Sequence, residues 1–276
     1  MKNQQILVIG GTGKTGRRVV ERLTQAGHQV RIGSRNADIP FDWHQPATWT
    51  NALTGMDAVY ITFQPDLAVP GSTEAIEGLS AMAVNLGVQK LVLLSGRGEK
   101  EAQACEKIVM NAGTSWTIVR ADWFHQNFSE SFFLDPILAG HVALPRAEAR
   151  IPFVDVEDIA DIVTAALTDD QHNGNIYELT GPRLLSFEEV VLEIAKVTGR
   201  NIQYHAISMD EYNQLLKQHQ LPDSYIWLIN YLFDEVLDGR NANLTQDVEK
   251  VLGRPARDFS DYAKQTALTG VWHPQV

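Results

Sequence analysis

The first half of the chain alternates between short apolar runs and longer segments with apolar residues at helical spacing. The short runs are rich in β-branched residues and have the length of buried strands. In the segments between them, apolar residues recur three and four positions apart, which indicates one buried helix face. The pattern predicts strands at 5–10, 29–34, 57–63, 90–95 and 115–119, and helices near 15–26, 73–86 and 99–112. Strands that alternate with helices in this way predict an α/β fold with a doubly wound parallel sheet.

The regular alternation ends after Arg120. Residues 121–150 are predicted to form a loop region with many aromatic side chains. Ile151–Val154 is predicted to be a short strand, and a helix with clean apolar spacing follows it. Asn175–Leu179 is predicted to be a further strand of the sheet.

From about residue 181 the pattern becomes mostly helical. Two S-x-x-E capping boxes, at Ser186–Glu189 and Ser208–Glu211, mark predicted helix starts. Leu221–Leu237 is predicted to be a helix that is apolar on most sides. Such a helix fits a dimer face, a substrate lid or buried core, and the sequence does not separate these roles.

The first predicted strand ends abruptly in glycines. Gly10, Gly13 and Gly16 are spaced G-x-x-G-x-x-G, and a helical pattern starts directly after them. Glycines let the backbone approach a ligand closely, and the N-terminus of the next helix favours an anion. A phosphate-binding P-loop would need a glycine where the chain has Val8, inside the strand. The stretch therefore predicts a dinucleotide-binding unit.

Ser34 and Arg35 follow the second predicted strand. NAD-binding proteins usually carry an acidic residue near this position, which bonds the ribose 2′-hydroxyl. A guanidinium instead suits a 2′-phosphate, because it can bind that group through two parallel hydrogen bonds. The sequence therefore predicts NADP(H) as the cofactor. It also predicts an NADP-binding Rossmann domain at 1–180 and a smaller, mostly helical substrate region at 181–276, against which segments of 121–150 pack.

Composition narrows the class of protein further. The 276 residues carry a net charge of −11, which disfavours a nucleic-acid partner. The single cysteine, Cys105, falls on an apolar helix face and is predicted to be inert core. No signal peptide, membrane-spanning apolar run or metal-ligand pattern is evident, so we expect a soluble cytoplasmic protein without a metal.

Several motifs together resemble the NmrA-like group of atypical short-chain dehydrogenase/reductases. They are Gly10–Thr15, Phe41–Trp43, Leu91–Ser95, Trp116–Arg120, Trp123–Glu130, Ile151–Ala160 and Glu178–Pro182. The likeness covers most of the chain and is greatest to the branch with ergot-alkaloid iminium reductases and unassigned bacterial NAD(P)-binding proteins.

The resemblance implies a set of cofactor contacts. The implied residues are Gly10, Thr12, Gly13, Lys14, Thr15 and Gly16 at the pyrophosphate, Ser34 and Arg35 at the 2′-phosphate, Asp42 near the adenine, Thr62 and Phe63 along the ribose and diphosphate, and Ser95 and Gly96 near the nicotinamide ribose. It also implies that Trp123 and Phe124 approach the nicotinamide or a substrate. With Phe128, Trp227 and Tyr231 they could line an aromatic substrate pocket, and the alternative is that these aromatic residues form core.

Typical short-chain reductases use a Tyr-x-x-x-Lys pair as proton donor, and this chain has none. No lysine stands four residues after any of its seven tyrosines. Substrates that accept hydride without obligatory protonation suit such a site. We therefore expect an NADPH-dependent reductase for a small planar electron-poor molecule, such as a quinone or an iminium ion. The alternative is a non-catalytic NADP(H)-binding redox sensor that acts through a protein partner. The substrate, the stereochemistry and any oligomer stay open.

Overall fold

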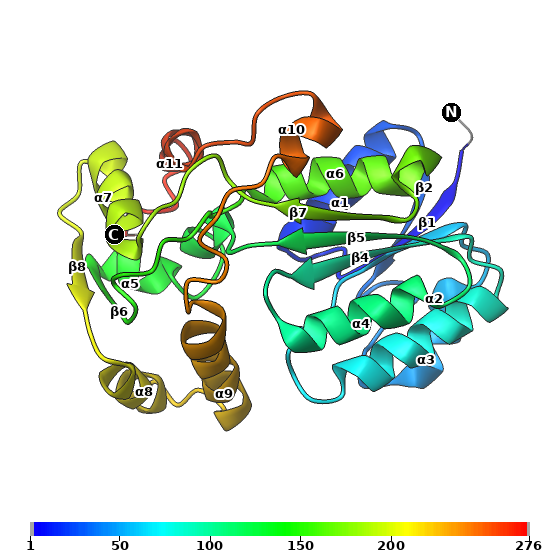
Figure 1. Ribbon diagram of the computed structural model, residues 1–276, viewed down its shortest axis with the longest axis horizontal. Coiled ribbons are helices and arrows are strands. Elements are labelled where there is room, and N and C mark those ends of the chain that lie inside the picture. Colours follow the sequence, from blue (N-terminus) through cyan, green and yellow to red (C-terminus); the bar gives the residue numbers. More distant parts are fainter. Residues whose placement is uncertain (1–2, 275–276) are drawn as a thin grey trace. The chain divides into compact units, whose positions relative to one another are not determined.

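The chain passes repeatedly between two structural units, as the computed structural model of residues 3–274 shows (Figure 1). The first unit contains the chain up to Ala121, Val156–Leu179 and Asp247–Arg254. The second unit contains Asp122–Asp155, Thr180–Gln246 and the chain from Pro255 onward. Each unit therefore combines segments that are distant in the sequence.

A six-stranded parallel sheet is the centre of the first unit. Its strands, in spatial order, are β2 (Gln29–Gly33), β1 (Gln5–Ile9), β3 (Ala58–Ile61), β4 (Lys90–Gly96), β5 (Ser115–Ala121) and β7 (Asn175–Leu179). Every neighbouring pair is parallel. All four residues of β3 are buried, as expected for a strand covered on both faces. The predicted doubly wound α/β fold is confirmed.

Helices cover both faces of this sheet. They are α1 (Lys14–Gln25), α2 (Trp49–Leu53), α3 (Ser72–Asn85), α4 (Lys100–Met110), α6 (Val156–Thr168) and α10 (Asp247–Leu252), with short turns η1 (Pro46–Thr48) and η3 (Asp170–His172). Helices α1 and α6 lie together on one face, and α3 and α4 lie together on the other (Figure 1). Cys105 is buried on α4, as predicted, and burial raises the pKa of its thiol.

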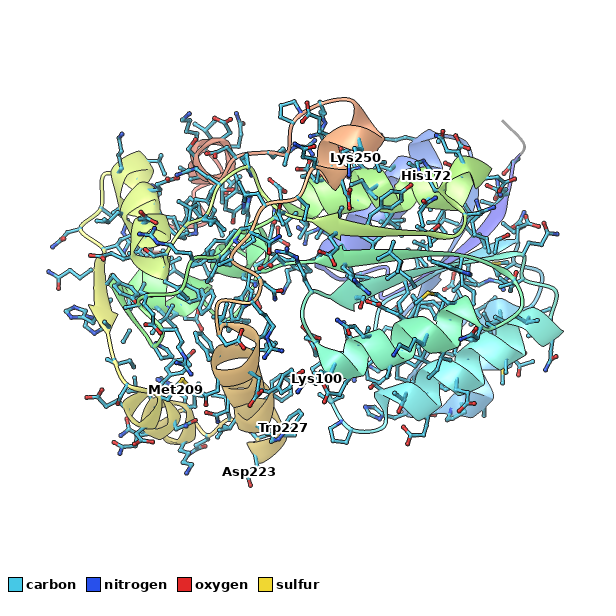
Figure 2. The ribbon with its side chains drawn as sticks, viewed as in Figure 1. Lys100, His172, Met209, Asp223, Trp227 and Lys250 are labelled. Atoms are coloured by element: carbon cyan, nitrogen blue, oxygen red, sulfur yellow. The ribbon has the colours of Figure 1, made fainter. Side chains whose placement is uncertain are left out.

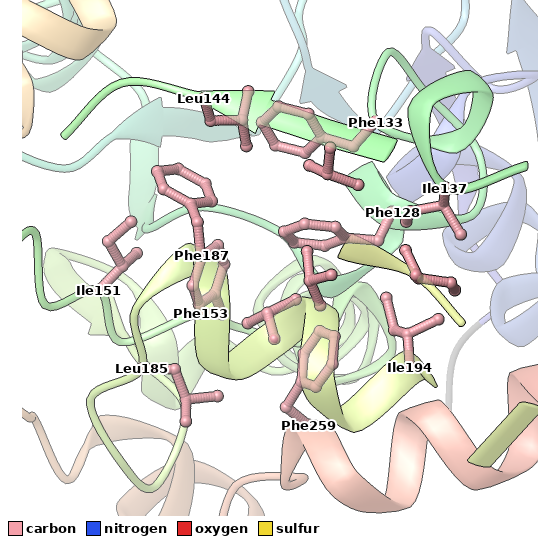
Figure 3. Close-up of a cluster of buried hydrophobic side chains, with 14 of the residues drawn as sticks. Phe128, Phe133, Ile137, Leu144, Ile151, Phe153, Leu185, Phe187, Ile194 and Phe259 are labelled. Atoms are coloured by element: carbon pink, nitrogen blue, oxygen red, sulfur yellow. The ribbon is translucent and has the colours of Figure 1, made fainter. Parts of the chain in front are cut away.

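The second unit is mainly helical and has its own core. Its elements are η2 (His125–Phe128), α5 (Leu134–Ala139), β6 (His141–Leu144), α7 (Phe187–Thr198), β8 (Gln203–Ala206), α8 (Met209–Gln218), α9 (Asp223–Tyr231), the π-helical η4 (Leu232–Val236) and α11 (Phe259–Ala267). Strands β6 and β8 form a parallel two-stranded sheet. Aromatic rings of Phe128, Phe133, Phe153 and Phe187 fill the core (Figure 3).

The structure corrects two local predictions. The predicted loop at 121–150 contains η2, α5 and β6. Ile151–Val154 is not a strand, because its ends form only isolated bridges, from Ile151 to Leu185 and from Val154 to Phe124. Both predicted capping boxes are present, at the starts of α7 and α8. The predicted helix at 221–237 is α9 continued by the π-helical turn η4.

Candidate functional site

The glycine loop between β1 and α1 is tightly closed. Gly10 has a φ of +70°, and a Cβ there would lie 2.3 Å from Thr62 Oγ1. A Cβ on Gly16 would lie 2.1 Å from the Gly10 carbonyl oxygen. The same carbonyl accepts a 2.8 Å hydrogen bond from the Gly13 backbone N–H. Only glycine fits positions 10 and 16, because a side chain at either would overlap Thr62 or the loop backbone.

The helix after the loop begins in a way that favours an anion. Gly13 is the N-cap of α1, it provides no side-chain cap, and the first turn has no acidic residue. The positive end of the helix dipole therefore lies at the loop, and no carboxylate in the first turn of α1 neutralises it. Thr12 is exposed there, whereas Thr15 is buried and accepts a 3.1 Å hydrogen bond from the Tyr60 hydroxyl.

Ser34 and Arg35 lie directly after β2, at the same edge of the sheet. Arg35 is exposed, and within residues 3–274 its side chain forms no hydrogen bond or ion pair. The Ser34 carbonyl accepts the backbone N–H groups of Ala37 and Phe41, which folds the following segment back toward β2. The guanidinium is therefore available to a phosphate group.

Asp42 is committed to its own turn. Its Oδ1 accepts the His44 backbone N–H at 3.0 Å, and its Oδ2 accepts from Gln45 Nε2 at 3.2 Å. Its carbonyl accepts from Trp49 Nε1 at 2.8 Å. The carboxylate that the resemblance puts near the adenine is thus used to shape the turn before α2.

Thr62 and Phe63 follow β3 and lie close to the glycine loop. Thr62 Oγ1 donates to the Ile9 carbonyl at 3.0 Å, which fixes the end of β3 against the end of β1. The Phe63 ring lies 4.8 Å from that of Trp43. Gly10, Thr62 and Ser34 therefore share one edge of the sheet, the carboxyl ends of parallel strands where dinucleotides bind in such folds.

Ser95 is buried and points into the unit. Its hydroxyl donates a 2.6 Å hydrogen bond to Glu106 Oε1 on α4. Arg120 on β5 binds Glu106 through two hydrogen bonds, at 2.8 and 2.6 Å, and Glu178 through a third at 2.8 Å. These bonds, first those to Glu106, raise the pKa of Arg120. Ser95 is therefore part of a buried charge network, and a Cβ on neighbouring Gly96 would overlap the Glu99 carboxylate.

Sequence reasoning missed this network. Its signal was present, since Glu106 falls on an apolar helix face and Arg120 within an apolar strand. A charged side chain on a buried helix face or strand requires a partner of opposite charge. The positions of Glu106 and Arg120 in the sequence therefore indicate an ion pair between them.

The aromatic residues of the second unit differ in burial. Phe128 is completely buried in the core, which corrects its prediction as a pocket residue. Trp123 and Phe124 are half-buried, and the Trp123 ring packs 5.3 Å from that of Phe233. Trp227 projects from α9 (Figure 2) and is 45% exposed. Its ring stacks on Tyr231, with centroids 5.7 Å apart and planes at 16°.

Two classes of feature are missing from the described part of the chain. Among residues 3–274, there is no group of three or more His, Cys, Asp or Glu side chains that could hold a metal ion. Within that range, none of the helices has the length and hydropathy to span a bilayer.

The fold and this edge of the sheet define a dinucleotide-binding protein of the doubly wound α/β class. Residues 100–266 match the NmrA-like family, and residues 10–170 match an NAD(P)H-binding family. The chain belongs to the NmrA-like family and contains an NAD(P)H-binding domain.

Several relatives are named as reductases or dehydrogenases. The NAD(P)H azoreductase of Xenophilus azovorans is 29% identical, over 95% of this chain and 98% of its own length. The agroclavine dehydrogenase of Claviceps fusiformis is 28% identical, over 97% of this chain and 98% of its own. Citrobacter sp. triphenylmethane reductase, solved with NADP(H), has the same fold, with a TM-score of 0.74 at 18% identity over 95% of this chain and 99% of its own.

Proposed function

We propose that this chain is an NADPH-dependent reductase that delivers hydride to a small planar electron-poor substrate, such as a quinone or an iminium ion. The observation that carries the proposal is the edge of the sheet where three features meet: a loop with two positions that accept only glycine, a helix N-terminus without a side-chain cap, and the exposed Arg35. A loop that a Cβ would block fits close contact with a pyrophosphate. The bound cofactor would supply the hydride.

In this proposal the chain's own residues bind and orient the cofactor. Backbone groups of the loop hold the pyrophosphate, and Arg35 with Ser34 holds the 2′-phosphate, which favours NADPH over NADH. The Thr62 hydroxyl is bonded to the Ile9 carbonyl directly before the glycine loop, so this part of the cradle is held by the protein's own hydrogen bond.

A tyrosine proton donor is not part of the proposal. Tyr60 lies in β3, but its hydroxyl is bonded to Thr15 in the core, and burial raises its pKa. None of the seven tyrosines has the partner lysine. A substrate that takes hydride and needs no immediate proton, or takes its proton from water, suits this arrangement.

The second unit is proposed to supply substrate recognition. The stacked Trp227 and Tyr231 rings offer a flat, partly exposed aromatic surface. Such a surface favours planar molecules, and aromatic faces also attract cations. The net charge of −11 also favours a cationic substrate.

The test has two stages. Calorimetry first measures binding of NADPH and NADH, and loss of NADPH absorbance is then followed with quinones, iminium compounds and cationic dyes. Turnover that requires both the protein and one of these classes supports the reductase. Tight NADPH binding without turnover on any class overturns catalysis and favours a sensor that acts through a protein partner. No binding of either dinucleotide rejects the site itself.

A further inference from the structure

A histidine and an aspartate lie side by side inside the second unit. His125 begins η2, Asp155 directly precedes α6, and the two residues are 1% and 3% exposed. His125 Nδ1 lies 3.5 Å from Asp155 Oδ2, which is ion-pair distance. Asp155 Oδ1 accepts a 2.7 Å hydrogen bond from Gln126 Nε2. Neither residue of the pair is among the proposed cofactor contacts, so the burial of these two titratable groups needs its own explanation.

The partners of the imidazole define where its hydrogens lie. Nε2 of His125 lies 3.0 Å from the Phe153 carbonyl oxygen, which can only accept, so Nε2 carries a hydrogen. In a neutral ring Nδ1 would then be an acceptor that faces the Asp155 carboxylate, which is also an acceptor. Nδ1 is buried and forms no hydrogen bond within the part of the chain that the structure describes. Two buried acceptors in contact are unfavourable, whereas a hydrogen on Nδ1 turns the contact into an ion pair.

The other titratable groups around the imidazole leave this contact to Asp155. From α11, the Tyr262 ring packs 5.2 Å from the His125 ring. The Tyr262 hydroxyl donates to Ser129 Oγ at 2.7 Å, and burial raises the pKa of Tyr262, so the phenol stays neutral. Glu130, which follows η2, is a further carboxylate that acts on Tyr262. The proton between His125 and Asp155 therefore decides whether their contact is attractive or repulsive.

The pair lies where two segments of the second unit are joined. The His125 backbone N–H donates to the Val154 carbonyl at 2.9 Å, and the Val154 N–H donates to the Trp123 carbonyl at 2.9 Å. Trp123 follows the end of β5, at Ala121, by two residues. In doubly wound sheets, dinucleotides bind outside the carboxyl ends of the strands. The segment that His125 and Asp155 fix therefore begins at an edge where a cofactor is expected.

We propose that His125 and Asp155 hold a proton between them as a buried ion pair, and that this proton positions the Trp123–Phe124 segment for hydride transfer. The inference rests on the proposed function, because it takes that reaction as the one affected. Both are positioning residues, since neither is proposed to contact substrate or cofactor. When the proton is lost at alkaline pH, two acceptors face each other in the core and the segment loses its arrangement. Activity is therefore expected to decline on the alkaline side.

The first experiment observes the proton directly, by NMR of the histidine ring nitrogens in the whole protein without ligand at neutral pH. His125→Gln removes one set of signals and so assigns those of His125. Both His125 nitrogens are expected to have the chemical shifts of a protonated imidazole. Burial lowers the pKa of His172, whose Nδ1 lies 2.8 Å from the Tyr177 hydroxyl, so His172 is the neutral reference. An unprotonated Nδ1 on His125 would overturn the inference.

The second experiment compares the pH profiles of kcat/KM for a substrate that the wild type reduces. In Asp155→Asn the amide can donate to a neutral His125 Nδ1, while its oxygen still accepts from Gln126. This contact needs no proton, so the alkaline decline should disappear. His125→Gln leaves Asp155 without its charged partner, and kcat is expected to fall about 10- to 100-fold at every pH, with little change in KM. His172→Gln, in the first unit, is the control and should keep the wild-type profile.

The outcomes separate this inference from the proposed function. If the alkaline decline is absent from the wild type, or is the same in Asp155→Asn, the positioning role is overturned while the proposed reduction stands. A structural role alone would change stability and leave the pH profile as it is. If the wild type turns over no substrate, the proposed function fails and takes the positioning role with it, and the NMR experiment still decides whether the pair holds its proton. Thermal melting shows whether each variant folds, and Asp155→Asn preserves the comparison if His125→Gln does not fold.

Discussion

The hydroxyl of Ser95 at the end of β4 donates a 2.6 Å hydrogen bond to Glu106 on α4. Glu106 is 1% exposed and also holds Arg120 with two hydrogen bonds. A strand end that lies among the proposed cofactor contacts is therefore fixed from inside the unit by a buried carboxylate. A buried carboxylate stabilises the fold only while its hydrogen-bond and ion-pair partners are present, because a buried charge without a partner is energetically costly.

Glu106→Gln is accordingly expected to lower the free energy of unfolding by about 2–4 kcal/mol, since Arg120 loses the charge of its buried partner and keeps only Glu178 as a carboxylate partner. Urea denaturation measures this difference. Glu77→Gln on the exposed face of α3 is the control and is expected to change stability by less than about 0.5 kcal/mol. A loss in Glu106→Gln as small as the control's would show that the network contributes no net stability.

The cofactor preference is tested at Arg35. Arg35→Asp replaces the proposed partner of the 2′-phosphate with a like charge, so NADPH binding is expected to weaken by about 1.5–3 kcal/mol. NADH lacks that phosphate, and its affinity is expected to stay the same or rise. Calorimetry with both dinucleotides gives the comparison. An unchanged NADPH affinity removes Arg35 from the site.

The glycine loop is tested at Gly16. A methyl group there would lie 2.1 Å from the Gly10 carbonyl, so Gly16→Ala is expected to displace the loop, abolish NADPH binding and cost about 1–3 kcal/mol of stability. In the control Gly78→Ala, a helical methyl meets Trp49 at 3.4 Å, an ordinary contact. That variant is expected to bind NADPH normally. Retained binding in Gly16→Ala would reject the loop as the pyrophosphate site.

Much of the first unit could be predicted from the sequence, because its signals are local. Apolar runs and the glycine spacing each report on neighbouring residues, as do the two capping boxes of the second unit. Strands β6 and β8 could not be predicted in this way. Each has four residues, and they pair across a long stretch of intervening chain. Strands this short show no clear alternation of apolar and polar residues, and their pairing depends on contacts between distant segments.

The candidate site shows the same division between local and tertiary information. Gly10 and Gly16 could be predicted, since their role is a backbone conformation. The partner of Ser95 could not, because a hydrogen bond to Glu106 on α4 decides where its hydroxyl points. The π-helical end of the 221–237 helix is likewise a tertiary outcome, with the Phe233 carbonyl accepting from Arg146 on a distant segment at 3.0 Å.

Acid should weaken the second unit through Asp258. Burial raises the pKa of Asp258, but hydrogen bonds from Arg183 at 2.6 and 2.8 Å, and from Ser260, outweigh burial, so its pKa lies below the ordinary value. A lowered folded-state pKa contributes stability above the unfolded value of about 4, and that contribution is lost as the pH falls through the folded value. Asp258→Asn is therefore expected to be less stable than the wild type at neutral pH.

The gap between the two proteins should shrink as the pH falls below about 4, where the carboxyl of the unfolded wild type is protonated, and should close only when the carboxyl of the folded wild type is neutral as well. Urea midpoints measured from neutral to acid pH give this gap directly. Asp261→Asn, on the same helix but with a carboxylate that is 70% exposed, is the matched control and should show a small gap at every pH. A gap for Asp258→Asn that does not change with pH would exclude the ion pair as its source.

Substrate recognition is tested at the stacked pair on α9. Trp227→Leu removes a ring that is 45% exposed and stacked on Tyr231, so KM for a planar cationic dye is expected to rise about 10-fold while kcat changes little. The affinity for NADPH is expected to stay at the wild-type value, because Trp227 has no proposed contact with the cofactor. Tyr225→Leu, which removes a comparably exposed ring from the same helix, should leave KM unchanged. Equal KM values for wild type and Trp227→Leu would mean that the substrate binds elsewhere. The exposed aromatic face of the helix would then be better explained as a contact between copies of the chain.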